Sequence, residues 1–228
     1  MRLPNLPYQL GNTVAVGNKQ VHTRTILSQR MSAQKQQWLQ QCLTRADLAL
    51  THSTGRALVR APALRNGTYA LGPYNMLGNP TVANFCNDFV TYFWLDPAHA
   101  DVVANVMDTY RNACVSIQRG LQGPFDIVDL PIMKQGGQSC GYVRRYASGG
   151  TVVRRGAIHI DFGRISAATI DAVADTLIHE AAHKFIAAKD HAYQYQAARW
   201  TALTPLTAIE NADSISKFAM TALTNNLQ

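Results

Sequence analysis

Glutamate is nearly absent from this chain of 228 residues, and it occurs only at Glu180 and Glu210. No apolar run approaches the roughly 20 residues that span a bilayer, so no membrane span is expected. The N-terminus lacks the charged start and unbroken apolar stretch of a secretory signal. These absences predict a globular protein without a classical export signal, and they make each Glu informative.

Closely spaced cysteine pairs are also lacking. Cys42, Cys86, Cys114 and Cys140 lie too far apart for a CxxC metal knuckle. Four cysteines permit two disulfides in three pairings, and buried thiols on helices are an equally good interpretation. The sequence therefore leaves the disulfide state open.

The net charge of +7 comes mostly from scattered arginines, of which only two pairs are adjacent, Arg144-Arg145 and Arg154-Arg155. A basic surface can attract nucleic acid, anionic membrane or cell wall, but scattered charges are more typical of a solvated face. No nucleic-acid partner is expected, and a basic nucleic-acid-binding module remains the alternative from another class.

The periodicity predicts a single α+β domain over residues 28–228, preceded by an N-terminal extension or arm over residues 1–27. Helical spacing of apolar residues predicts helices over 28–52, from Asp96 to about Gly120, from about Ser166, over 192–203 and over 211–223, with a long loop over 54–80. Alternation predicts short strands over 125–128, 142–144 and 158–162, in a small antiparallel or mixed sheet.

The helix predicted from Ser166 carries a His-Glu-x-x-His pattern at His179, Glu180 and His183. Histidines four apart lie one above the other on a helix and can bind one metal ion. Zinc bound by neutral imidazoles with an open position makes water acidic enough for a nearby Glu to take its proton. Chance placement would produce this pattern in about two of a thousand such sequences. We therefore expect a zinc site, with Glu180 as general base.

A catalytic zinc site takes three protein ligands, and the residues alone leave Asp190, His191 and Glu210 as candidates for the third. The segment from Lys189 to Tyr193 resembles the Lys-Asp-x-Ala-Tyr element of the aspzincin metallopeptidases, the deuterolysin and peptidyl-Lys metalloendopeptidase group. The segment Asn211-Ala212-Asp213 is similar to that family's Asn-Ala-Asp segment. The resemblance covers about the last 130 residues.

The resemblance implies a zincin-like fold and a zinc-dependent endopeptidase acting on proteins or peptides. It implies His179, His183 and Asp190 as zinc ligands, Glu180 as general base and acid, and Tyr193 as a hydroxyl donor to the oxyanion. Aspzincins usually have a Gly-Thr element before the ligand Asp and a Gly after the Tyr, whereas Ala187-Ala188-Lys189 and Gln194 occupy these places here.

Substrate contacts are expected at three further residues. The resemblance places Asp213 in the pocket for the residue after the cleaved bond, which predicts at most a moderate preference for Lys or Arg there. His159 and Ile160 lie on the predicted strand 158–162, which is expected to form the sheet edge that pairs with an extended substrate. The chain is expected to be secreted or delivered as an effector, and a toxin or effector peptidase domain shares the same chemistry.

Overall fold

The computed structural model describes residues 8–16, 19–26, 32–67, 80–123, 125–129, 141–148, 151–162 and 169–224. The chain forms two compact units. The first comprises residues 1–46 and 119–187, and the second comprises residues 47–118 and 188–228. The helices α1 (Ala33–Arg65) and α3 (Ala100–Gln122) each contribute residues to both units.

The first unit is built on a five-stranded mixed sheet with the order β1-β2-β3-β5-β4. Its strands are β1 (Tyr8–Val16), β2 (Lys19–Ile26), β3 (Asp126–Asp129), β4 (Gly141–Ser148) and β5 (Thr151–Ile160). The pairs β1–β2 and β4–β5 are antiparallel, whereas β2–β3 and β3–β5 are parallel. The strands predicted from alternation are thereby confirmed, and β5 is an interior strand.

Residues 8–16 and 19–26 belong to this sheet, although the absence of periodicity over residues 1–27 predicts an extension or arm. The pairing of β1 with β2 has an irregular register between Leu10 and Thr13. A bulge of this kind breaks the period of two. The alternation that marks a strand is therefore interrupted in the sequence.

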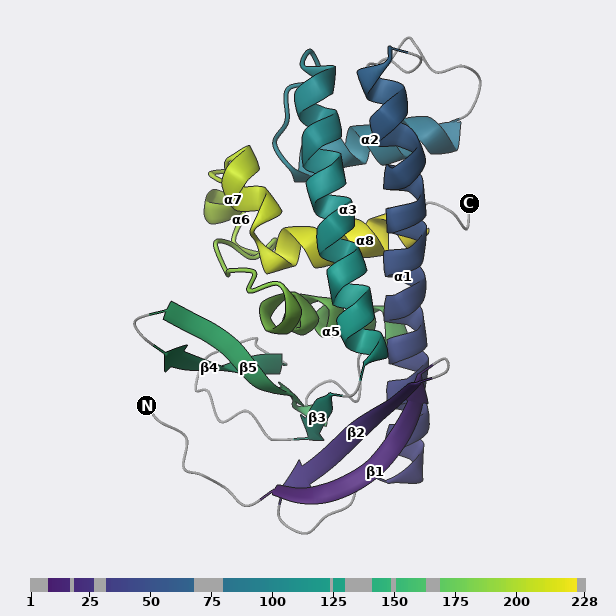
Figure 1. Cartoon of the computed structure of the whole chain (residues 1–228), viewed down its shortest axis with the longest axis vertical. Helices are drawn as coiled ribbons and strands as arrows, with labels where there is room; N and C mark the ends of the chain where they lie inside the picture. The colour runs from purple at the N-terminus through teal and green to yellow at the C-terminus, as the bar shows by residue number, and fades with distance from the viewer. Residues whose placement is uncertain are drawn as a thin grey trace. The chain divides into compact units, whose positions relative to one another are not determined.

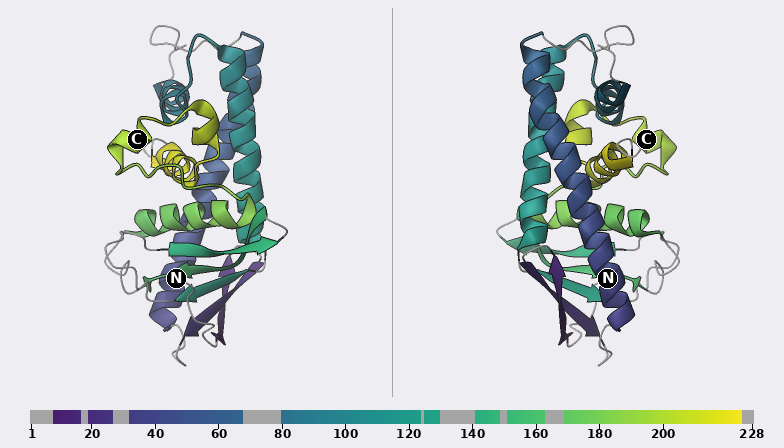
Figure 2. Two further views of the ribbon diagram at one scale, coloured as in Figure 1. Left: turned by 90° about the vertical axis from the view of Figure 1, so that its left-hand side faces the viewer. Right: turned by 90° about the vertical axis from the view of Figure 1, so that its right-hand side faces the viewer.

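Helix α5 (Ile170–Phe185) lies across one face of the sheet and packs on β4 and β5 (Figures 1 and 2). Thr169 caps its N-terminus, because the Thr169 hydroxyl accepts a hydrogen bond from the amide of Ala172 at 3.2 Å. Asp171 stands in the first turn, where a carboxylate offsets the positive end of the helix dipole, and it pairs with Arg45 at 2.6 Å. The predicted helix over this region is confirmed.

The second unit is helical and closes around a cluster of buried aromatic rings. Its further helices are α2 (Pro80–Tyr92), α6 (Ala197–Trp200), α7 (Pro205–Ile209) and α8 (Ala212–Thr224). Most of the ring pairs pack edge-on or tilted, and Phe85 stacks on Phe89, at centroid distances of 4.6–6.5 Å. The rings belong to Phe85, Phe89, Phe93, Tyr110 and Phe218. This cluster joins α2 and α3 to α8.

Two of the predicted boundaries differ from the observed ones. The loop predicted over 54–80 is helical up to Arg65, because buried Ala57, Ala61 and Leu64 continue the apolar face of α1 past Gly55 and even past Pro62. The helix predicted over 192–203 is reduced to α6. Residues 188–196 form a loop whose backbone is held by hydrogen bonds to residues 210–213.

Cys42, Cys86 and Cys114 are buried thiols, as one of the two interpretations expects, and Cys140 lies outside the described residues. Burial raises the pKa of the Cys42 and Cys114 thiols to about 12. Within the described part of the chain, no helix combines the length and the apolar character that crossing a membrane requires.

Candidate metal centre

The two histidines of the motif lie on the buried face of α5. His179 is 8% exposed and His183 is 3% exposed, and their Nε2 atoms lie 3.0 Å apart. The two rings are nearly perpendicular, at 87°, with centroids 4.7 Å apart. Two imidazole nitrogens bound to one tetrahedral zinc ion, each roughly 2.0–2.1 Å from it, stand about 3.3 Å apart. The observed spacing is close to that value.

Asp190 brings a carboxylate oxygen to the same place. Ligand atoms of His179, His183 and Asp190 all lie within 4.8 Å of one another, and this is the one group of three or more potential metal ligands among the described residues. Two nitrogens and one oxygen, with room for a further ligand, are the donor set of a catalytic zinc site.

The chain turns sharply between His183 and Asp190. Helix α5 ends at Phe185, and Ala187, just beyond the Ile186 cap, has a φ of 56°. This left-handed conformation is common at the end of a helix, usually with glycine, and it costs other residues about 1–2 kcal/mol. Ala187 stands where aspzincins usually have the Gly of the Gly-Thr element. Ala187 therefore adopts the left-handed conformation that a glycine would favour, so the replacement of glycine by alanine does not prevent this turn.

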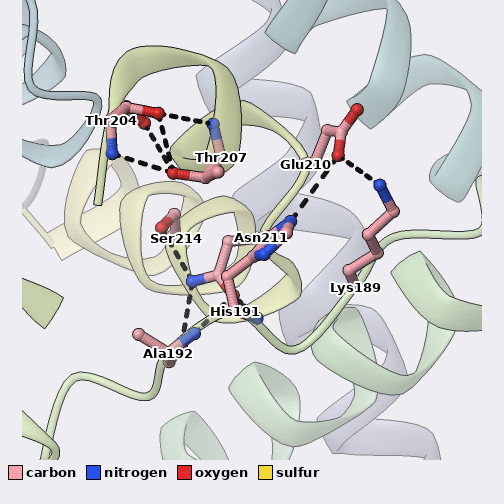
Figure 3. A network of polar contacts seen from close by, with 8 residues as sticks. All are labelled: Lys189, His191, Ala192, Thr204, Thr207, Glu210, Asn211 and Ser214. Carbon is pink, nitrogen blue, oxygen red and sulfur yellow. Dashed lines mark hydrogen bonds and ion pairs between the residues drawn. The ribbon is translucent and has the colours of Figure 1, made fainter. Parts of the chain in front are cut away.

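Neither alternative third ligand belongs to the described metal-binding group. His191 Nε2 instead lies 3.5 Å from Glu210 Oε2, and Lys189 Nζ lies 2.7 Å from the same oxygen (Figure 3). The hydrogen bond from Lys189 lowers the pKa of the Glu210 carboxyl. Glu210 is thus engaged by a partly exposed ion pair.

A family comparison adds evidence from the sequence. The family model described as lysine-specific metallo-endopeptidase, of the aspzincins, matches residues 86–220, which is more than half of the chain. The chain belongs to the aspzincin family. No curated protein and no solved structure matches it in the corresponding comparisons. Aspzincins are zinc metallopeptidases, so membership identifies the class of reaction and the metal.

Glu180 is 5% exposed and lies close to Gly141, the first residue of β4. A Cβ atom added to Gly141 would stand 2.9 Å from Glu180 Cγ and 3.1 Å from Glu180 Oε1. The approach of β4 to Glu180 therefore requires glycine at this position. Sequence reasoning missed Gly141, because a single glycine at a strand end carries no signal of the side chain that it faces.

We expect Gly141→Ala to reduce kcat/KM by about 10- to 100-fold, since a misplacement of about 1 Å in a catalytic group can cost this much. The added methyl group displaces the buried Glu180 side chain and leaves the histidines in place, so zinc content should be unchanged. Steady-state kinetics and metal analysis provide the measurement. The matched control is Gly123→Ala, whose Cβ would meet only backbone oxygens at 3.4 and 3.5 Å. Equal activity of Gly141→Ala and Gly123→Ala would contradict the conclusion that Gly141 leaves space for Glu180.

His159 and Ile160 are not at a sheet edge, and this expectation is wrong. β5 pairs with β3 on one side and β4 on the other, and His159 and Ile160 are 1% and 0% exposed. The ring of His159 stacks on Tyr142 with centroids 4.3 Å apart. These two residues therefore support the sheet and have no exposed surface for substrate. β4 is instead the last strand of the described sheet.

Tyr193 and Asp213 both lie in the second unit, and Asp213 is hydrogen-bonded to the residue that follows Tyr193. Asp213 Oδ2 accepts a hydrogen bond of 2.7 Å from the amide of Gln194, which follows Tyr193. Tyr193 is half-buried, and its ring stacks on that of Tyr195 at 5.3 Å. Asp213 is 7% exposed, and Ser216 is buried with its hydroxyl 3.3 Å from the carbonyl oxygen of Asp213.

Proposed function

We propose that this chain is a zinc-dependent endopeptidase in which His179, His183 and Asp190 hold the metal and Glu180 moves the proton. The observation that carries the proposal is that one ligand atom each of His179, His183 and Asp190 lie within 4.8 Å of one another. Membership of the aspzincin family supports the same ligands.

The residues present suit zinc better than a harder cation. Two imidazoles with one carboxylate are typical zinc ligands, whereas Mg²⁺ and Ca²⁺ prefer sites made of oxygen atoms. A zinc ion held here supplies Lewis acidity, which polarises a substrate carbonyl and makes a water molecule acidic near neutral pH. The two imidazoles would hold the ion as neutral groups, and the Asp190 carboxylate would reduce the net charge of the centre.

Glu180 acts as general base and then as general acid. It is adjacent to His179 in the sequence and lies buried on the same helix, with the backbone of β4 packed against its side chain. Its carboxylate accepts the proton of the attacking water and afterwards gives this proton to the leaving amine. A single carboxylate can serve both steps because the first step loads the proton that the second one uses.

Tyr193 donates a hydrogen bond from its hydroxyl to the oxygen of the cleaved carbonyl. Negative charge develops on this oxygen during attack, and a preorganised donor stabilises the charge where it appears. The proposal is supported by the resemblance of the Lys189–Tyr193 segment to the family element. The stacking of Tyr193 on Tyr195 restricts the ring of Tyr193.

An extended peptide pairs with the outer edge of β4, the last strand of the described sheet. The first residue of this strand, Gly141, lies so close to Glu180 that a Cβ atom added to it would stand 2.9 Å from Glu180 Cγ. Main-chain pairing with a sheet edge gives affinity with little dependence on side chains. It would present a peptide bond next to the catalytic carboxylate.

A preference for Lys or Arg after the cleaved bond should be moderate at most. One carboxylate oxygen of Asp213 accepts a hydrogen bond from the Gln194 amide, which reduces its attraction for a cation. The neighbouring Ser216 is buried, and its hydroxyl donates to the carbonyl oxygen of Asp213. We expect Asp213→Asn to reduce the ratio of cleavage before basic residues to cleavage before apolar ones by about threefold, since removing the carboxylate removes the attraction for a cation. Peptide-library cleavage profiles give this ratio. Indistinguishable profiles would exclude Asp213 from the specificity pocket and leave the zinc chemistry intact.

Incubation of the purified protein with a diverse peptide library, with and without a chelator, tests the whole proposal. We expect cleavage that the chelator abolishes and stoichiometric zinc restores. Metal-free protein that cleaves no peptide but binds DNA with a steep salt dependence would instead support the nucleic-acid-binding alternative.

A further inference from the structure

Asn211, immediately before α8, makes every hydrogen bond that a side-chain amide can make. Its Oδ1 accepts from the amides of His191 and Ala192, at 3.0 and 3.3 Å. Its Nδ2 donates to the carbonyl oxygen of Ala192 at 2.9 Å and to Ser214 Oγ at 3.0 Å. An amide offers two acceptor sites and two donors, so the capacity of this side chain is filled. Asn211 is also completely buried.

Three of these four bonds end on the backbone that directly follows Asp190. On the other side of Asp190, the amide of Lys189 donates to the carbonyl of Glu210 at 2.8 Å, and the carbonyl of Lys189 accepts from the amide of Ala212 at 2.9 Å. Figure 3 shows the Asn211 amide directed at Ala192 and Ser214. The backbone is therefore held both before and after Asp190 by residues 210–212.

Asp190 depends on these bonds because no regular structure holds it. It lies in the loop 188–196, where Lys189 forms only an isolated bridge with Asn211, and its own side chain is exposed. Backbone amides and carbonyls away from water need hydrogen-bond partners, and a fully engaged side chain can take the place of a neighbouring strand. Asn211 supplies such partners to two consecutive residues of this loop.

We infer that Asn211 is a positioning residue for the metal centre: its side-chain amide fixes the loop that presents Asp190 to the metal. This inference rests on the proposed function, since it concerns the ligand role of Asp190. Asn211 is not proposed as a ligand of the metal or as a contact of the substrate. It acts through its hydrogen bonds to the backbone of His191 and Ala192.

A side-chain amide suits this position because it combines two acceptor sites with two donors. Asn211→Asp keeps the shape and both acceptors but replaces the two donors, and it sets a carboxylate oxygen against the carbonyl of Ala192. Asn211→Ser removes most of the contacts without adding charge. Partners that orient metal ligands typically contribute 10- to 100-fold in metal affinity or activity.

The experiment compares wild type, Asn211→Asp and Asn211→Ser in zinc affinity by chelator competition, in kcat and KM, and in Tm. We expect both variants to bind zinc 10- to 100-fold more weakly. With zinc in excess, activity should recover in part, with kcat below and KM near the wild-type value. Partial rescue by zinc separates positioning of a ligand from general loss of folded protein.

Two control variants separate these effects further. Glu210→Gln removes the exposed ion pair with Lys189 from the same loop and should change zinc affinity less than threefold. Thr204→Ala breaks the capping box of α7 and should lower Tm without changing the zinc affinity of the folded protein. Zinc affinities of the Asn211 variants within threefold of wild type, or losses that zinc does not rescue and that follow Tm as in Thr204→Ala, would overturn the inference. Wild-type protein without chelator-sensitive peptidase activity would instead contradict the proposed function.

Discussion

Glu180→Gln should retain zinc and the fold and lose peptide hydrolysis, with kcat reduced by about 10²- to 10⁴-fold. The amide is close in size to the carboxylate and fits the same buried space beside Gly141. It cannot accept the proton of the attacking water, and general base catalysis contributes rate factors of this order. Steady-state kinetics, with metal analysis and circular dichroism of the same preparation, measure the effect.

The other glutamate of the chain provides the control. Glu210→Gln removes a carboxylate that pairs with Lys189 on a partly exposed surface, and its turnover should stay near that of wild type. Near-wild-type turnover of Glu180→Gln would remove Glu180 from the mechanism.

Asp190→Ala should weaken zinc binding by about 100-fold or more, while His191→Ala should change it less than threefold. The first variant removes one of three ligands and so exceeds the 10- to 100-fold effect typical of residues that only support a ligand. The second removes an imidazole that faces Glu210. Competition with a chromogenic chelator gives both affinities.

The order of these two affinities tests the position of the third ligand. A larger loss in His191→Ala would shift the ligand by one residue. Comparable losses in both variants would mean that the loop, and not one side chain, supports the metal.

The local parts of the site could be predicted because they depend on spacing within one element. Two histidines four apart within a helical period specify the arrangement on α5 with no knowledge of the rest of the chain. The strands that contain Ile127, Val143 and Ile158 follow equally from their alternation. Both patterns repeat within a few residues, so their physical cause is present in the sequence itself.

The order of the strands could not be predicted in the same way. Alternation shows which residues share a face of a sheet, but it does not show which strands are neighbours. The sequence therefore predicts an edge position for His159 and Ile160, although β5 pairs on both sides. The edge of the described sheet is β4, and nothing in the sequence around Gly141 predicts that this residue lies close to Glu180.

The loop that carries Asp190 shows the same limit. Its alanines and aromatic residues have an apparent helical period, which predicted a helix over 192–203. The observed backbone follows hydrogen bonds to Asn211, about 20 residues downstream, and these are long-range contacts that no local period encodes. The Asn-Ala-Asp match pointed to the correct segment without revealing that its asparagine faces the loop.

The proposed pairing of substrate with β4 also limits which proteins can be cut. A peptide that pairs with this strand must itself be extended and must have unsatisfied backbone amides and carbonyls along several residues. Segments inside the helices or sheets of a folded target do not meet this condition, because their backbone groups are already paired. Susceptibility of a target would then be governed by its local unfolding, so that termini, long loops and misfolded chains are cleaved first.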